Sequence, residues 1–187
     1  MAFNNTTPPT KSGTKRTLHQ QSITPISEIA PRIAEAIKPF SIVCEATITA
    51  VHHDQGFLYD ACTGCTKAVS KRGGSYWCYK CKELVDEPDI RLRIQFEIED
   101  ETAKQDITVF EEQAKKLLGK SLNDLLDLSA QENGKTLVNE ALDQIVGKRL
   151  RFYIRISEFN LTNPDSPPTA QKFSEATEKE AKNPKQN

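Results

Sequence analysis

The sequence predicts a mostly β protein in which a small curled barrel carries an inserted zinc ribbon. Three observations support this fold class: two closely spaced Cys-x-x-Cys pairs, a strictly alternating strand at 89–99, and a basic, aromatic strand at 148–159. At 187 residues the chain is long enough for one domain with tails. We therefore expect a single domain at 25–160, a disordered tail at 1–24, and a mostly disordered tail at 161–187 with a weak closing strand at 169–173.

The most specific feature is a set of four cysteines at zinc-ligand spacing: Cys62, Cys65, Cys78 and Cys81. Two residues between cysteines let a tight turn direct both sulfurs at a point about 2.3 Å away. Four thiolates close the coordination sphere of one Zn²⁺, so we expect a single structural ion in a ribbon at 57–85. The alternatives are redox-active dithiols or the disulfides of a secreted protein, and nothing resembling a secretory signal precedes the cysteines.

The first barrel strand is expected at 41–51, where apolar and polar residues alternate. The fifth cysteine, Cys44, falls on the apolar side of this strand, so we expect a buried structural thiol there. A short helix is expected before the strand, at 27–37.

The middle of the chain predicts two strands followed by helices. Residues 89–99 place five aliphatic or aromatic side chains on one face and charged or polar ones on the other. A shorter strand at 105–110 turns Ile107 and Val109 toward the core, and leaves Phe110 on the face that Arg91 and Gln95 share. Helices are expected at 111–118, 121–128 and 136–146, between the third and fourth barrel strands.

The last strand, at 148–159, predicts a nucleic-acid-binding face. Its non-core positions are basic and aromatic: Arg149, Arg151, Tyr153, Arg155 and Phe159. Unpaired nucleic acid is held by cations that follow the phosphates and by rings that stack on bases, each stack contributing about 1 to 3 kcal/mol. The alternative is a solvated strand face with two incidental rings.

Composition excludes several classes of protein. The formal net charge is -1, and no apolar run is long enough to span a bilayer, so no membrane partner is expected. We expect no enzyme, because the chain has no glycine-rich phosphate loop and the predicted zinc site is closed. The adjacent His52 and His53 point to opposite strand faces and are expected to lie on a surface loop.

The order of strands, insertion and helices is compatible with an oligonucleotide-binding (OB) barrel. Combined with this order, several short motifs resemble the C-terminal DNA-binding domain of the replication protein A large subunit over about residues 40–160. They are Tyr59-Asp60-Ala61-Cys62, Cys65-Thr66-Lys67-Ala68-Val69, Trp77-Cys78 with Cys81, Ile107-Thr108-Val109-Phe110 and Leu117-Leu118-Gly119.

The resemblance implies an OB-fold barrel with an inserted zinc ribbon that binds single-stranded DNA in replication, recombination or repair, and hence a nuclear protein. It also implies that the four cysteines are zinc ligands and that Phe110 and Phe159 stack on bases. Members of the family carry further DNA-binding domains before this one, and a C-terminal helix that assembles with two smaller subunits. We expect no such helix here, because three prolines and a polar tail follow residue 160, and other replication protein A subunits are kept as candidate partners beside single-stranded DNA.

Two classes of function fit this sequence. The first is single-stranded DNA binding through Phe110, Phe159 and Arg91 together with the basic strand. The second is a protein-interaction module, because barrels of this kind host many functions. An RNA-binding paralogue is a further alternative, since stacking alone does not separate DNA from RNA.

Overall fold

The computed structural model describes residues 21–176. Most of the tail predicted at 1–24 and the end of the tail predicted at 161–187 lie outside the described residues. No helix among residues 21–176 is both long and apolar enough to cross a membrane.

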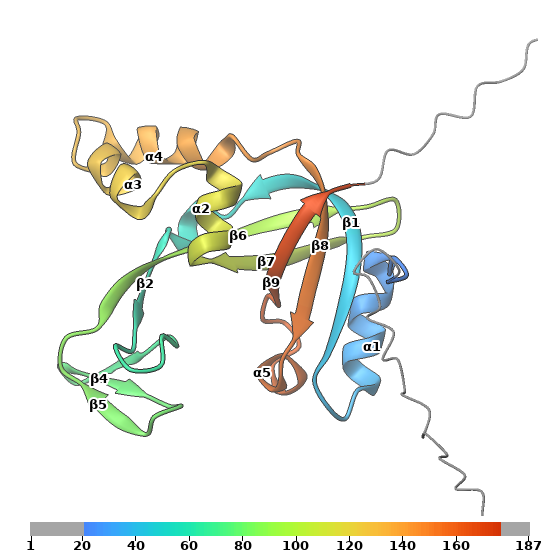
Figure 1. Cartoon of the computed structure of the whole chain (residues 1–187), viewed down its shortest axis with the longest axis horizontal. Helices are drawn as coiled ribbons and strands as arrows, with labels where there is room; N and C mark the ends of the chain where they lie inside the picture. The colour runs from blue at the N-terminus through green and yellow to red at the C-terminus, as the bar shows by residue number, and fades with distance from the viewer. Residues whose placement is uncertain (1–20, 177–187) are drawn as a thin grey trace, which may run out of the picture.

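Five strands close into an OB-like barrel (Figure 1): β1 (Phe40–Val51), β6 (Asp89–Glu99), β7 (Lys104–Phe110), β8 (Arg149–Ile156) and β9 (Thr169–Glu175). The strand order is β1-β8-β9-β7-β6, and β6 pairs back with β1. All neighbours are antiparallel except β7 and β9, which are joined in parallel at Thr108 and Thr169. The mostly β fold predicted from the sequence is confirmed.

Alternation of apolar and polar residues determines the barrel interior. Every second residue of β8 is buried, and so is every second residue of β6 from Leu92 on, whereas Ile90, expected on the same face, is 56% exposed. Phe96 packs against Phe152 with ring centroids 6.0 Å apart. Removing either ring is expected to cost about 3 to 5 kcal/mol, because a fully buried aromatic leaves a cavity. Cys44 is fully buried in this core, and burial raises the pKa of its thiol to about 12, as expected for a structural thiol.

Helices close the two ends of the barrel. At one end, α1 (Ile29–Glu35) follows a single 3-10 turn (Ile26–Glu28), and it buries Ile29 and Ile33. Between β7 and β8 lie α2 (Glu111–Leu118), α3 (Leu122–Ser129) and α4 (Gly134–Asp143), as the predicted position of the helices requires. Their apolar residues, among them Leu117, Leu125 and Leu142, join the barrel core.

Two predicted helix boundaries shift for local reasons. The helix expected at 27–37 ends at Glu35, because Lys38 precedes Pro39 and a residue before proline disfavours helical backbone. The helix expected at 136–146 begins at Gly134, where an added Cβ would lie 2.2 Å from the carbonyl oxygen of Ser129. Only glycine fits this close approach of two helices.

The predicted strand at 148–159 extends three residues too far at its C-terminal end, and this moves Phe159. Ser157 accepts a hydrogen bond from the backbone N–H of Asn160 at 3.3 Å, and the Asn160 side chain accepts one from the Ser157 N–H at 3.1 Å. This reciprocal cap ends β8 at Ile156 and starts α5 (Glu158–Thr162). Phe159 therefore lies on a short helix, and the strand alternation that we applied to it was wrong.

The chain continues as ordered structure beyond residue 160. The candidate strand at 169–173 is present as β9, which extends to Glu175 and pairs with β8 and β7. β9 contributes Ala170 and Phe173 to the core, so the barrel is completed by residues that the expected division at 160 leaves outside it.

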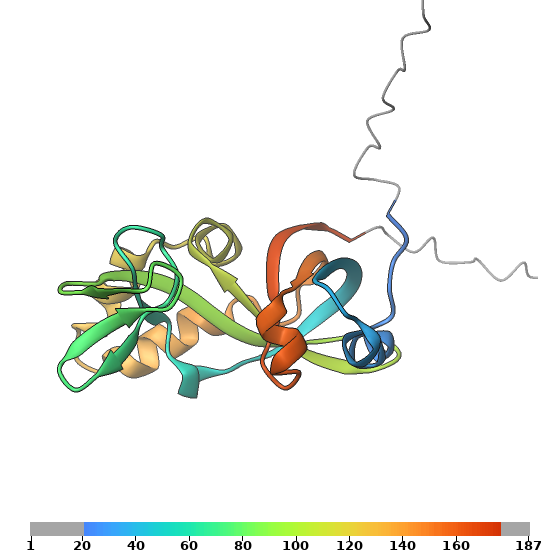
Figure 2. The ribbon, with the colours of Figure 1, turned by 90° about the horizontal axis from the view of Figure 1, so that it is seen from below.

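A separate small sheet is inserted between β1 and β6. It consists of β3 (Ser70–Arg72), β4 (Ser75–Cys78) and β5 (Glu83–Val85). After the 3-10 turn His53–Gln55, β2 (Leu58–Ala61) pairs with the first part of β6 and connects this small sheet to the barrel. Figures 1 and 2 show the small sheet (green) at the end of the β2–β6 arm, apart from the barrel.

Candidate nucleic-acid interface and metal centre

The four predicted cysteines converge in the inserted sheet. Their sulfurs all lie within 4.8 Å of one another, and two of the pairs are Cys62–Cys81 at 3.9 Å and Cys65–Cys78 at 3.5 Å. A tetrahedron of sulfurs with bonds of about 2.3 Å has edges of about 3.8 Å. The cluster therefore has the donor set and the size for one tetrahedral, thiolate-preferring metal ion.

Both cysteine pairs adopt the same local turn. The backbone N–H of Thr66 donates to the Cys62 carbonyl at 2.9 Å, and that of Lys82 donates to the Cys78 carbonyl at 2.8 Å. Thr66 and Lys82 have φ angles of 64° and 57°, in the left-handed region. Two equivalent turns therefore present their sulfurs to one point, as the spacing predicts.

Two of the four thiols have pKa values that depart from the ordinary value of a cysteine. The backbone N–H of Cys81 donates to the Cys78 sulfur at 3.4 Å and is the main cause that lowers the pKa of Cys78 to about 7. Hydrogen bonding to the sulfurs of Cys65 and Cys78 raises the pKa of Cys81 to about 12. Four thiolates at these distances would repel one another, and a bound cation would compensate their charge.

A groove of about 730 Å³ lies where the insertion meets the barrel. Its walls come from β2, β6, β7, the first cysteine turn, α5 and the loop before β9. The lining residues that carry charge or a ring are Tyr59, Lys67, Arg91, Arg93, Phe110, Glu111 and Phe159. Three cations and three rings thus face one hollow, with one acid among them.

The floor of the groove is fixed by strand pairing. Tyr59 lies opposite Arg91 on β2 and β6, and Arg93 lies opposite Phe110 on β6 and β7. The rings of Tyr59 and Phe110 meet edge to face with centroids 5.3 Å apart. Phe110, Arg91 and Gln95 share one face, as predicted.

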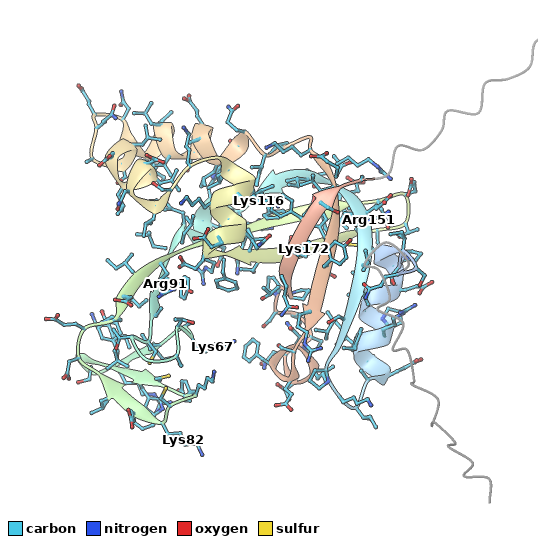
Figure 3. All side chains as sticks on the ribbon, in the orientation of Figure 1. Lys67, Lys82, Arg91, Lys116, Arg151 and Lys172 are labelled. Carbon is cyan, nitrogen blue, oxygen red and sulfur yellow. The ribbon has the colours of Figure 1, made fainter. Side chains whose placement is uncertain are left out.

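The opposite wall carries Phe159 on α5, with its side chain 62% exposed. Lys67 comes from the first cysteine turn, which is tied to β2 because the Cys62 N–H donates to the Lys67 carbonyl at 2.8 Å. In Figure 3, Arg91 and Lys67 lie on the side of the insertion that faces α5. A correctly folded cysteine cluster is therefore needed to hold one wall of the groove.

The groove has hydrogen-bonding groups that the described residues leave unsatisfied. Buried Nε of Arg91, Nε of Arg93 and Oε1 of Glu111 have no hydrogen-bond partner among residues 21–176. The Arg91 guanidinium is 3.9 Å from both Asp89 and Glu111, too far for a hydrogen bond. Burial and the Glu111 carboxylate raise the pKa of Tyr59, so its hydroxyl is neutral. The two guanidinium groups and the neighbouring rings are of the kind that binds an anionic, ring-bearing ligand, whereas Glu111 opposes one.

The backbone is strained at Glu111, one of the residues that line the groove. Glu111, the first residue of α2, has a φ of 43°, where a residue with a Cβ costs about 1 to 2 kcal/mol. It follows Phe110 directly, and the turn between them sets the direction of both side chains.

Four predicted site residues lie elsewhere. Arg149, Arg151, Tyr153 and Arg155 do face outward from β8, but they do not line the groove. Arg151 donates to Glu45 on β1 through Nε at 3.0 Å and Nη2 at 2.6 Å, and Figure 3 shows it on the β1 side of the barrel. Arg149 and Arg151 thus do not line the groove that Phe110 and Arg91 line, and their role in nucleic-acid binding stays a prediction.

Sequence reasoning missed three groove residues. Arg93 is two positions from Arg91, so the alternation that selected Arg91 selects it equally. Tyr59 and Lys67 belong to the insertion, and only the pairing of β2 with β6 brings them to the groove. No period in the sequence reveals that pairing.

The fold and the site together define a five-stranded OB-like barrel with a four-cysteine insertion and a basic, aromatic groove between the two. The chain belongs to the Replication factor-A C terminal domain family, whose model matches residues 41–166.

The names of proteins with similar sequences agree with this family. The chain is 28% identical over 134 residues to a replication protein A 70 kDa DNA-binding subunit of Arabidopsis thaliana, in an alignment that covers 68% of this chain and 17% of the relative. A second 70 kDa DNA-binding subunit of the same organism is 35% identical over 89 residues, covering 44% of this chain and 14% of the relative. The chain thus spans about a fifth or less of the length of these relatives.

A solved structure of a replication protein A heterotrimer bound to single-stranded DNA superposes with a TM-score of 0.61. The superposition covers 84% of this chain and 37% of that one, at 21% identity. At this identity the similarity supports the fold.

Proposed function

We propose that this protein binds single-stranded DNA in the groove, and that its four cysteines hold one structural Zn²⁺. The observation that supports the proposal best is the convergence of rings and cations from both sides of the groove on one hollow. The names of the relatives support the choice of ligand, since they are DNA-binding subunits of replication protein A.

The rings are assigned to the bases and the cations to the phosphates. Phe110 belongs to the floor of the groove and Phe159 to the wall formed by α5, and Tyr59 supports Phe110 edge to face. Arg91, Arg93 and Lys67 provide the positive charge beside them. Stacking does not depend on base identity, because every base has a π face, so binding is expected with little sequence preference.

Zinc is the metal that the cysteine cluster fits best. Four thiolates in a tetrahedral arrangement are typical of structural zinc sites, and they leave no coordination position for water or a substrate. When bound, the ion would neutralise the thiolates and fix the two turns, and this would hold Lys67 against the groove.

The process follows from the family. We infer that the chain acts on DNA strands exposed in replication, recombination or repair, and that it works in the nucleus with other replication protein A subunits. A fluorescently tagged chain is expected to accumulate in the nucleus, and co-purification with smaller subunits of the family would test assembly.

The central test is a fluorescence anisotropy titration of labelled oligo-dT at low salt. Phe110→Ala is expected to weaken binding about 5- to 150-fold, which corresponds to a lost stack of about 1 to 3 kcal/mol. Phe110→Tyr keeps the ring and is the matched control, expected to bind within about twofold of the wild type. Wild-type protein that fails to bind at low salt, or equal affinities for both variants, would refute the proposal.

A further inference from the structure

The outer face of the barrel continues from the groove across β9 to β8. Paired residues on neighbouring strands point to the same side of a sheet. Gln95 pairs with Thr108, Thr108 with Thr169, and Thr169 with Arg155. The first three line the groove, so Arg155 is the next outward side chain in the same row. With strands about 4.8 Å apart, it lies roughly 10 Å from Thr108.

Arg155 belongs to a small basic patch, which we call the β8–β9 patch and define as Tyr153, Arg155 and Lys172. Tyr153 and Lys172 are paired across the two strands, and the Lys172 ammonium lies 5.6 Å from the centre of the Tyr153 ring. Arg155 donates to the Ser41 hydroxyl at 3.4 Å. Neither cation forms an ion pair with a carboxylate within residues 21–176, so both charges are available to a ligand.

The patch has a boundary on β1. Val43, which pairs with Tyr153, is buried, and its carbonyl accepts a hydrogen bond from the Thr24 N–H at 2.7 Å. Further along β8, Arg149 and Arg151 both approach the carboxylate of Glu45, at 3.8 and 2.6 Å. Positive charge that is available to a ligand thus extends from the groove to the patch and ends there.

We propose that the DNA strand leaves the groove over Thr169 and that its next phosphates contact Arg155 and Lys172. This inference rests on the proposed function and adds a path to it. The partner is the phosphate backbone of the same strand, because the patch continues the row of groove residues and carries positive charge. The Tyr153 ring holds the Lys172 ammonium at the surface through a cation–π contact.

The test compares two lengths of oligo-dT, one of about 4 nucleotides and one of about 16, which span the site sizes of single OB folds. The double variant Arg155→Ala with Lys172→Ala is expected to bind the short strand like the wild type. It should bind the long strand at least about fivefold more weakly at low salt, and its salt dependence should fall by roughly 1.4 in log–log slope.

Arg149→Ala is the matched control. It removes the same charge from the same strand, roughly 20 Å from Arg155, and should leave both affinities unchanged. Arg155→Lys, which keeps the charge, should recover most of the binding. Thermal melts of all variants establish that they are folded, and Lys172→Glu gives a second substitution at an exposed position.

The outcomes are distinct. Equal losses on both lengths, equal losses in the Arg149 control, or full affinity of the double variant for the long strand would each overturn the path. If a polyglutamate peptide binds the wild type but not the double variant, while the affinity for the long strand is the same for both, the patch would be assigned to acidic protein segments instead. Wild-type protein that binds neither length would refute the proposed function itself.

Discussion

The outer faces of β6 and β8 both carry arginines at alternate positions, but they belong to two different surfaces. On β6, Arg91 lies among rings and is 3.9 Å from Glu111. On β8, Arg151 is 15% exposed and makes two hydrogen bonds to Glu45, whose side chain is 9% exposed. The alternation within a strand shows which residues point outward. The neighbouring strand determines whether an outward arginine can meet a ligand or is held by the fold.

Removal of the metal is expected to have the largest effect on DNA affinity, and to act on the groove surface alone. Stripping the metal with a strong chelator is expected to disorder the insertion, because folding and metal binding are coupled in small thiolate sites. Loss of the wall that carries Lys67 should weaken oligo-dT binding more than about tenfold, since phosphate contacts and an enclosed groove are lost together. Anisotropy measures the affinity, and amide exchange measures order in the insertion.

The barrel serves as the internal control for this experiment. Its core is built from strands and helices outside the insertion, so amides of β1 and β8 should stay protected. Unchanged DNA affinity in protein shown to be free of metal would separate the cysteine cluster from the groove, and would contradict the link between them.

Arg151→Ala should show the opposite behaviour. It leaves Glu45 as a mostly buried carboxylate without its main partner, and is expected to cost roughly 2 to 3 kcal/mol of unfolding free energy. DNA affinity should stay within about twofold of the wild type. Urea denaturation and anisotropy are measured on the same protein.

A double-mutant cycle sharpens this prediction. Glu45→Ala combined with Arg151→Ala removes both partners, so the double variant should be less destabilised than the sum of the single variants. Additive losses would show that the two side chains contribute separately. If Arg151→Ala alone strongly weakened DNA binding, β8 would belong to the DNA-binding surface, as the sequence analysis predicted.

Strong periodicity made much of this fold predictable. The strand at 89–99 was predicted with the bounds that β6 has, because five apolar residues alternate strictly with polar ones. The spacing of the cysteines identified the cluster, since a local turn brings each pair together. The end of β8 was missed because the cap formed by Ser157 and Asn160 overrides the alternation, and an apolar residue after it resembles a continued strand.

The arrangement of the surfaces was not predictable from the same patterns. The outer surface of a barrel surrounds its whole axis, so outward residues of β6 and β8 can lie on different sides of the molecule. Their positions depend on strand order and on partners such as Glu45, which is 106 positions from Arg151. Such pairings are set by tertiary packing, and a single sequence contains no local signal for them.

Glu45→Gln should turn the β8 arginines toward solution and make the two surfaces more alike. Neutralising this carboxylate releases the charges of Arg149 and Arg151, so the affinity for a long oligo-dT should rise about two- to threefold at low salt. The gain should disappear at high salt, because it is electrostatic. Salt-dependent anisotropy titrations measure it.

Glu97→Gln is the matched control for that experiment. Glu97 pairs with Lys104 at 2.8 Å on the β6–β7 side, and the substitution changes the net charge equally. It should leave the affinity closer to that of the wild type. If both variants gain equally, net charge alone explains the effect and the role of Glu45 is refuted.

A further effect, on stability alone, concerns Asp100, which holds the N-terminal segment beside β1. Its carboxylate accepts hydrogen bonds from the N–H groups of Ile26 at 2.8 Å, Thr102 at 2.7 Å and Ala103 at 3.0 Å. Burial opposes ionisation, but these bonds and one from the Thr102 hydroxyl outweigh it and lower the pKa of Asp100.

A lowered pKa means stability that is present above the ordinary value near 4 and is lost as the pH falls further. Asp100→Asn is therefore expected to cost about 1 kcal/mol at pH 7 and progressively less below pH 4, measured by urea denaturation across that range. Because Asp100 is not among the residues that line the groove, DNA affinity at pH 7 should not change. A pH-independent loss of stability would show that the carboxylate charge is not what holds the segment.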